Sequence, residues 1–439
     1  MVLIPFLYFA ALTAYWWKQH HGIDVCVYMS GLYAFISFCA VAIVGGDLLD
    51  AGGILFDEYN IELGLIPTIL FCALITLGIF PFSLIFNKEI KQIKKTNSLI
   101  LDCFCWFLFF VFIINLYLIV DSTLEILSGD LSSVRMDHYE GIQSPAEVKA
   151  ESMPRIFGYF FYFNISTLLA LPLFFYYVCC GSKPWWFKAM LIATSLSYPL
   201  YGMQAADRTE FTFYVMMLIF CLVFFWNLLS KKFKRNMAII GTPFVLIIII
   251  YLVAVSQARF AGKDDDNEKV SEAALQYAGQ GYLNFCYFWE NGKFEHISAE
   301  REFPFTYHTL FKIDSNPERR ADRSGQQGFF ISVFATYVGD ILIDLSPIGA
   351  ILWCLIFFII CMATIRFNHK EEYDAGDILA LFVLAAIPIF GIFYYRYHGF
   401  NSFFLFVPTV MIYFFSKNII VYEPTRPEID HNSPEVENI

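Results

Sequence analysis

The chain of 439 residues is 58% hydrophobic and 19% aromatic, and its mean hydropathy is +0.57. Several runs of 16–24 residues contain no charged side chain, which excludes an ordinary soluble domain and is typical of an all-α polytopic membrane protein. A β-barrel would instead show short segments of alternating polarity. The net charge of −11 is spread over loops and a C-terminal tail, and we expect no nucleic-acid partner.

Apolar runs predict about eleven transmembrane helices in a single domain, 1–416. The residues that follow, 417–439, are rich in proline and acid and are predicted to form a disordered cytoplasmic tail. The predicted spans are 2–17, 25–44, 63–86, 99–120, 156–180, 189–204, 211–229, 237–255, 348–365, 377–395 and 400–416.

One further apolar segment, 329–346, is interrupted by Asp340 and Asp344 and is followed by Pro347. These residues favour a re-entrant or interfacial helix over a membrane span. The alternative is that the segment crosses, which gives 12 spans and places Arg366 and Lys370 outside.

Short connections rich in lysine indicate the orientation of the chain. The positive-inside rule places these lysines in the cytoplasm, so we expect the N-terminus outside, the C-terminus inside, and external loops at 121–155 and 256–328. The lysines concerned are Lys18, Lys88, Lys91, Lys94, Lys95, Lys183, Lys188, Lys231, Lys232, Lys234, Lys370 and Lys417.

The loop 256–328 is far longer than an ordinary connection, and its aromatic content argues against disorder. We interpret it as a folded cap that lies on the membrane over an active site. Its twelve acids outnumber its nine bases, so any phosphate site must be local.

Arginine and lysine divide unequally between the two sides. The predicted topology places fifteen basic residues inside and fourteen outside, and nine of the outside set are arginines. Arginine favours planar, bidentate recognition of phosphate and always keeps its charge. The alternative is that these side chains snorkel or pair with nearby acids such as Asp207 and Glu210. The external arginines are Arg135, Arg155, Arg208, Arg259, Arg301, Arg319, Arg320, Arg323 and Arg396.

Two of these arginines, Arg208 and Arg396, occupy tight turns between predicted spans, and Arg259 follows the eighth span. All three are therefore expected at the depth of a lipid diphosphate headgroup, where charged groups are functional candidates. Arg323 and Arg135 are additional candidates for binding the diphosphate.

His308 is the candidate general base, because a neutral imidazole can accept the proton of a sugar hydroxyl. The alternatives are a loop acid in that role, or a histidine that only packs at the surface. The first external loop has no paired DxD or ExD motif, and the sequence has no Cys/His spacing of a metal site, so no metal is expected.

Four stretches resemble the bacterial O-antigen polymerases, the Wzy-type polymerases of oligosaccharide repeat units. They are Gln204-Ala205-Ala206-Asp207-Arg208-Thr209, Ala258-Arg259-Phe260, the stretch from Tyr277 to Phe285, and the stretch from Val333 to Gly349. Asp207 stands where the family has Gly or Ser. Asp344-Leu345-Ser346 stands where it commonly has Asp-Phe-Gly.

The resemblance implies a GT-C-like glycosyltransferase fold with a large external loop. It also implies a metal-independent reaction without cofactors, in which glycan is transferred from undecaprenyl diphosphate to a lipid-linked repeat unit at the outer face of the bacterial inner membrane. Arg208 and Arg259 would bind the diphosphate, and His308 would act as the base. Sugars would stack on three aromatic residues of the large loop, Tyr277, Tyr282 and Tyr307. Partners would be the bilayer, a chain-length regulator and a flippase.

Two other functions fit the same sequence. A flippase or another transporter for lipid-linked oligosaccharides would also be polytopic, although such transporters usually place ionisable groups at the bilayer midplane. An O-antigen ligase would use the same fold and the same arginines, and would differ in the glycan acceptor.

Overall fold

The structure is a computed structural model that describes residues 1–46, 63–96, 98–128, 148–149, 152–154, 160–181, 183–203, 208–239, 241, 266–294, 299–303, 327, 331, 333–367, 372–397 and 402–418. These residues are almost entirely helical, in agreement with an all-α membrane protein. Their main elements are α1 (Leu3–His20), α2 (Val25–Gly45), α4 (Leu65–Ile79), η1 (Phe80–Leu84), β1 (Gln92–Ile93), α5 (Ser98–Ser128), η2 (Phe163–Leu169), α9 (Ala170–Cys180), α10 (Trp185–Ser195), α11 (Ser197–Met203), α12 (Thr209–Phe225), α14 (Asp266–Asn291), α17 (Thr336–Phe367), β2 (Glu372–Tyr373), α18 (Ala375–Phe390) and α19 (Phe403–Asn418).

Five described helical segments are long and apolar enough to cross a membrane, and three shorter apolar helices accompany them. Most of the described helices match predicted spans to within a few residues, although α5 continues to Ser128, beyond the span expected to end near 120. The predicted span 237–255 lies largely outside the described residues, so the number of spans stays a prediction. The five long segments are Val25–Gly45, Leu65–Leu84, Leu99–Val120, Phe160–Cys180 and Thr336–Ile365.

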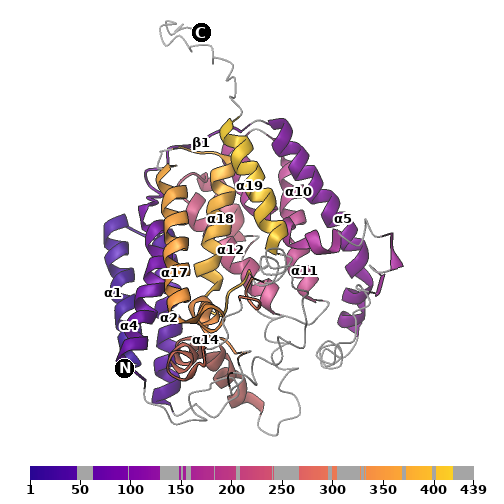
Figure 1. Cartoon of the computed structure of the whole chain (residues 1–439). Helices are drawn as coiled ribbons and strands as arrows, with labels where there is room; N and C mark the ends of the chain where they lie inside the picture. The colour runs from indigo at the N-terminus through magenta and orange to yellow at the C-terminus, as the bar shows by residue number, and fades with distance from the viewer. Residues whose placement is uncertain are drawn as a thin grey trace, which may run out of the picture.

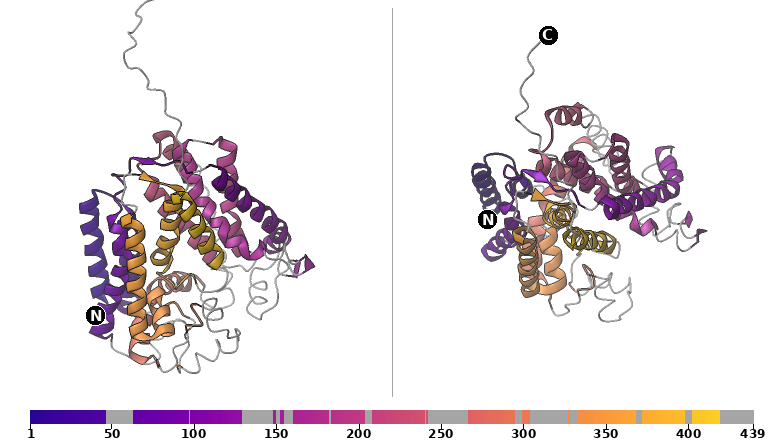
Figure 2. Two further views of the ribbon diagram at one scale, coloured as in Figure 1. Left: turned by 45° about the horizontal axis from the view of Figure 1, so that its top comes forward. Right: turned by 90° about the horizontal axis from the view of Figure 1, so that it is seen from above.

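The helices run roughly side by side in one bundle (Figure 1). Seen from above, α1, α2 and α4 form one side, α5 and α10 form the other, and α18 and α19 lie between them (Figure 2). The N-terminus and α14 lie at the lower end in Figure 1, while the short parallel pair β1–β2 lies at the upper end.

The upper end, which we call the lysine end, carries Lys88, Lys94, Lys183 and Lys417. The Lys94 ammonium lies 2.7 Å from Glu372, next to the β1–β2 pair. The Lys88 ammonium donates to the carbonyl of His21 at the end of α1, over 2.8 Å. The structure thus gathers at one end several connections for which the sequence predicts a cytoplasmic location.

The opposite end, which we call the arginine end, carries Arg208, Arg301 and Arg396 and is built around α14. This helix comes from the long polar loop, and it packs against α2 so closely that a Cβ added to Gly279 would lie 2.6 Å from the Ala40 nitrogen. Only glycine permits that approach. From Tyr282 to Phe288 every side chain of α14 is buried, so this part of the loop belongs to the body of the protein.

Helix α17 changes direction at Ser346, where φ is 68° and ψ is 171°. Pro347 follows, has no N–H for the helical ladder, and disfavours a helical conformation in the residue before it. The first part of α17 is viewed nearly end-on in Figure 1, whereas the second part runs along the bundle. The break coincides with the end of segment 329–346, whose re-entrant or interfacial character stays a prediction.

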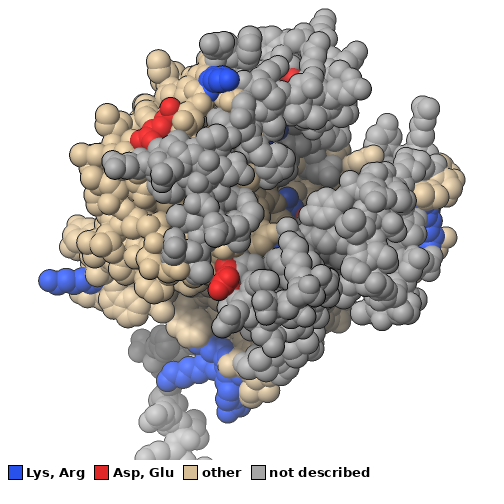
Figure 3. All heavy atoms as spheres, turned by 90° about the horizontal axis from the view of Figure 1, so that it is seen from below, with Lys and Arg blue, Asp and Glu red and all other residues tan. Residues whose placement is uncertain are grey.

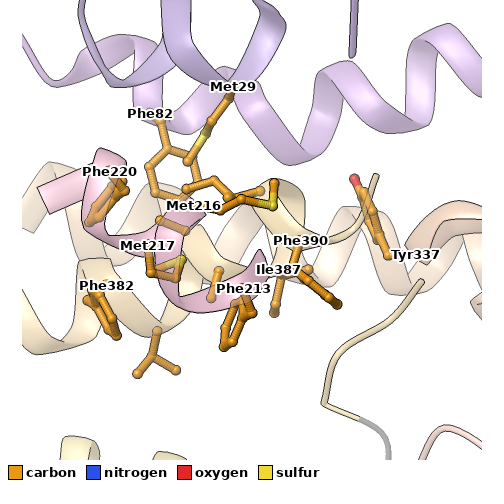
Figure 4. Close-up of a cluster of buried hydrophobic side chains, with 14 of the residues drawn as sticks. Met29, Phe82, Phe213, Met216, Met217, Phe220, Tyr337, Phe382, Ile387 and Phe390 are labelled. Carbon is orange, nitrogen blue, oxygen red and sulfur yellow. The ribbon is translucent and has the colours of Figure 1, made fainter. Parts of the chain in front are cut away.

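Aromatic side chains pack together with isoleucine and leucine throughout the core. In Figure 4, Phe213 and Met217 belong to α12. This helix lies between α18, which carries Phe382 and Phe390, and the segments that carry Met29 and Phe82. The rings of Phe213 and Phe390 meet edge to face with centroids 4.9 Å apart. Helix α12 is apolar all round, which is typical of a helix buried in a bundle within the membrane. Its packing fixes the position of its first turn, where the candidate site begins.

Candidate functional site

Two predicted site arginines, Arg208 and Arg396, are described, and the structure brings both to the arginine end. Tyr277 and Tyr282 are described as well. The other predicted site residues lie outside the described residues: Arg135, Arg259, Arg323, Tyr307 and His308.

Arg208 immediately precedes α12, and its carbonyl accepts from the backbone N–H and the hydroxyl of Thr212, each at 2.9 Å. Its guanidinium carbon lies 5.3 Å from the centroid of the Tyr277 ring on α14. This distance is typical of a cation–π contact. The side chain is only partly buried, so the start of α12 and helix α14 hold a cation at the edge of the protein.

Arg396 lies in the turn after α18 and is almost enclosed. Its guanidinium pairs with Glu210 at 3.0 Å, with 13% of each side chain exposed, and it donates to the Tyr198 hydroxyl. The rings of Phe213 and Phe390 lie 5.6 and 5.8 Å from it. Burial works against the charged form, but Tyr198, Tyr394 and Glu210 outweigh it and raise the pKa of Arg396 well above its ordinary value. Arg396 is therefore a fixed cation.

Glu210 joins the two arginines, because it stands two residues after Arg208 and pairs with Arg396. A Cβ on Gly202 would lie 2.8 Å from the Glu210 Cβ, so glycine in α11 allows this carboxylate to fit between helices. An acid in the first turn also suits the helix N-terminus. The Glu210–Arg396 pair thereby fixes the end of α12 from which Arg208 projects.

Three aromatic side chains connect Arg208 with Arg396 through successive contacts. The Tyr277 ring lies 5.4 Å from that of Phe334, and Phe334 lies 6.0 Å from Tyr394. The Tyr394 hydroxyl lies 3.5 Å from the Arg396 guanidinium. Segments far apart in the sequence therefore meet in one cluster of two arginines and three aromatic rings.

A second charged network, which the sequence did not predict, centres on Arg301. Its guanidinium lies 3.2 Å from Asp340, and the backbone N–H groups of Arg301 and Glu302 donate to Asp344 at 3.4 and 3.0 Å. Asp340 also accepts from the backbone N–H of Tyr395 at 2.7 Å. Burial opposes the charge of Arg301, but Asp340, Glu302 and Asp344 raise its pKa above the ordinary value.

This network pins the first part of α17 to the turn that carries Arg396, so we interpret Arg301 as a structural residue. The sequence did indicate an acidic pair at this place, because Asp340 and Asp344 are four residues apart and share one face of a helix. Their partner was unpredictable, since Arg301 is distant in the chain.

Tyr282 does not lie where a sugar could stack on it. Its ring is 1% exposed and packs 5.1 Å from Phe71, and its hydroxyl bonds to that of Thr68 at 2.7 Å. The tyrosine faces the contact between α14 and α4. It therefore supports the cap, and it has no place in the candidate site.

Viewed from below, separate blue and red groups lie among the tan atoms of this face, several further blue groups gather at its lower edge, and one basic group is recessed near the middle (Figure 3). Among the residues described, no group of three or more His, Cys, Asp or Glu side chains is placed to hold a metal ion.

No known family model, curated protein or solved structure matches the chain, so the site is interpreted from its own geometry.

Proposed function

We propose that the chain polymerises oligosaccharide repeat units linked to undecaprenyl diphosphate, by metal-independent glycosyl transfer at the external face of the bacterial inner membrane. The observation that supports this function is the placement of Arg208. Arg208 is a partly exposed residue at the start of a buried helix, its guanidinium lies 5.3 Å from the Tyr277 ring, and Glu210, two residues later, pairs with Arg396. A fixed cation of this kind suits a lipid diphosphate.

The proposed reaction breaks the bond between the anomeric carbon of the growing glycan and the oxygen of its diphosphate. A hydroxyl of the acceptor repeat unit forms the new bond to that carbon, and its proton passes to a base, for which His308 is the candidate. The products are an elongated lipid-linked glycan and free undecaprenyl diphosphate. Negative charge grows on the departing diphosphate, so a preorganised cation lowers the barrier.

Arg208 is the described residue placed to take this part, and Arg259 is the second candidate from the sequence. Arg396 has a different part in the proposal, because its charge is already balanced by Glu210 within the protein. It positions the start of α12, which carries Arg208.

The proposed orientation puts the arginine end outside and the lysine end in the cytoplasm. The lysines of the β1–β2 end support this, because positive residues favour the cytoplasmic side. The partners under this proposal are a flippase that delivers the repeat units and a regulator of chain length.

Reconstitution tests the function directly. The full-length protein, purified into lipid vesicles, is mixed with a synthetic repeat unit on undecaprenyl diphosphate, with and without a metal chelator. We expect a ladder of lipid-linked multimers in both cases. Single repeat units that stay unpolymerised but cross the bilayer would contradict the proposal and identify a flippase.

A further inference from the structure

Three partly exposed aromatic side chains lie next to one another at the arginine end. Tyr277 belongs to α14, Phe334 precedes α17, and Tyr394 follows α18. The rings of Phe334 and Tyr394 are nearly parallel, with an interplanar angle of 12°, while Tyr277 is tilted by 55° to Phe334. By contrast, the nearby rings of Phe213 and Phe390 are buried.

The backbone around these rings is fixed by hydrogen bonds. The Asn284 side chain of α14 donates to the Phe334 carbonyl at 2.8 Å. The backbone N–H of Thr336 donates to the Phe393 carbonyl at 3.0 Å, and that of Tyr337 donates to Gly391 at 2.8 Å. These bonds tie the segment before α17 to both α14 and the turn after α18.

Thr336 adopts a φ of 64°, which is rare for a β-branched residue and costs on the order of 1–3 kcal/mol. Such a conformation persists only where the surroundings over-determine it, and it clusters at binding and active sites. The backbone that carries Phe334, two residues earlier, is thus held in place before any ligand arrives. A preorganised surface of this kind loses little conformational entropy on binding.

Cations flank the three rings. The Arg208 guanidinium lies against Tyr277, and the Arg396 guanidinium lies beside the Tyr394 hydroxyl. A ligand that covers the rings therefore presents an apolar face to them and an anionic group to Arg208. A sugar ring joined to a diphosphate has both features, because its C–H face is apolar and its phosphates are charged.

We propose that Tyr277, Phe334 and Tyr394 form a stacking surface for the sugar attached to the lipid diphosphate. This inference rests on the proposed function and names the subsite for the donor sugar beside Arg208. Phe334 is its centre, since its ring lies between the other two.

Binding to two lipids that differ only in the sugar tests this subsite. The full-length protein in nanodiscs is titrated with undecaprenyl diphosphate and with undecaprenyl diphosphate carrying one N-acetylglucosamine. We expect wild type to bind the sugar lipid about threefold to tenfold more tightly, an increment typical of an aromatic stacking contact. Phe334→Leu and Tyr394→Leu remove this preference, while Phe334→Tyr keeps it.

Two further variants separate the subsite from the diphosphate site and from general effects. Arg208→Ala weakens binding of both lipids by the same factor, so the preference for the sugar lipid is kept. Phe110→Leu changes a ring on α5 that is 48% exposed and outside the cluster, and it leaves both affinities unchanged.

The stacking surface is refuted if wild type binds the two lipids equally, or if Phe334→Leu keeps the wild-type preference. A different result bears on the proposed function. If Arg208→Ala binds both lipids as wild type does while Phe334→Leu loses the preference, the diphosphate assignment is wrong and the stacking surface stands.

Discussion

Two ion pairs, one at each end of the bundle, hold their charges in different surroundings. At the lysine end, the Lys94–Glu372 pair leaves 53% and 30% of the two side chains exposed. At the arginine end, the Arg396–Glu210 pair leaves 13% of each exposed and is enclosed by aromatic rings. Arg301 and Asp340 are similarly enclosed, with 21% and 1% exposed.

This difference separates two uses of positive charge. The exposed Lys94–Glu372 pair is screened by water, and a pair of this kind contributes about 0–1 kcal/mol. Removing one partner of a buried pair leaves a desolvated charge and costs about 3–5 kcal/mol. The geometry of the arginine end therefore depends on individual buried ion pairs. This is expected of a binding site whose residues must keep their positions.

Glu210→Leu gives the largest expected loss of stability, because it leaves the Arg396 cation without its carboxylate. We expect the free energy of unfolding to fall by about 3–5 kcal/mol, measured by denaturation of the purified protein in detergent. Glu372→Leu is the matched change at the lysine end, and its expected loss is about 1 kcal/mol or less. Equal losses of unfolding free energy in the two variants would contradict the difference proposed between the two ion pairs.

Arg208→Ala gives the largest expected loss of activity. Removal of one donor to the developing charge lowers the rate of glycosyl transfer by about 10²–10³, measured as multimer formation in vesicles. Arg208→Lys restores part of the rate, since it keeps the charge and loses the planar geometry. Stability falls less than in Glu210→Leu, because Arg208 is only partly buried. An unchanged rate in Arg208→Ala would remove the diphosphate assignment.

Gly279→Ala tests whether α14 is an integral part of the arginine end. The added Cβ would meet the backbone of α2, with the carbonyl carbon of Cys39 at 2.7 Å, so we expect a loss of about 1–3 kcal/mol in the free energy of unfolding. Gly45→Ala on α2 is the control, because nothing lies within 4 Å of its added Cβ. A cap that only rests on the bundle would tolerate both changes.

The smallest expected effect is that of salt on the coupling energies of the two ion pairs. Raising the ionic strength to about 1 M shortens the Debye length to about 3 Å and weakens exposed pairs most. In double-mutant cycles, the coupling of Lys94 with Glu372 is expected to vanish in high salt, while that of Arg396 with Glu210 changes little. Equal salt sensitivity would mean that water reaches both pairs.

The helices were largely predictable, because apolar runs of sufficient length have few alternatives to a membrane helix. The interruption of α17 was also signalled, since Ser346-Pro347 follows two acids in an apolar segment. The burial of Tyr282 on α14 was not predictable. Tyr277 and Tyr282 are both aromatic residues of a polar loop, and only the packing of α14 on α4 shows that the second faces inward.

The cluster of Phe334 and Tyr394 was likewise hidden in the sequence. Both residues lie in apolar stretches where an aromatic ring usually indicates core packing. Their proximity to each other and to Tyr277 depends on how α14, α17 and α18 meet. Arg208 could be selected from its tight turn, whereas the pairing of Arg396 with Glu210 was only one of the alternatives for an interfacial arginine.

The most direct test of the central claim is the fate of the repeat units in cells whose only copy of the protein carries Arg208→Ala. The account predicts that long surface glycans disappear and that single lipid-linked repeat units accumulate on the outer leaflet, where an impermeant sugar-binding probe detects them. A normal ladder of chain lengths, or repeat units retained on the inner leaflet, would contradict it.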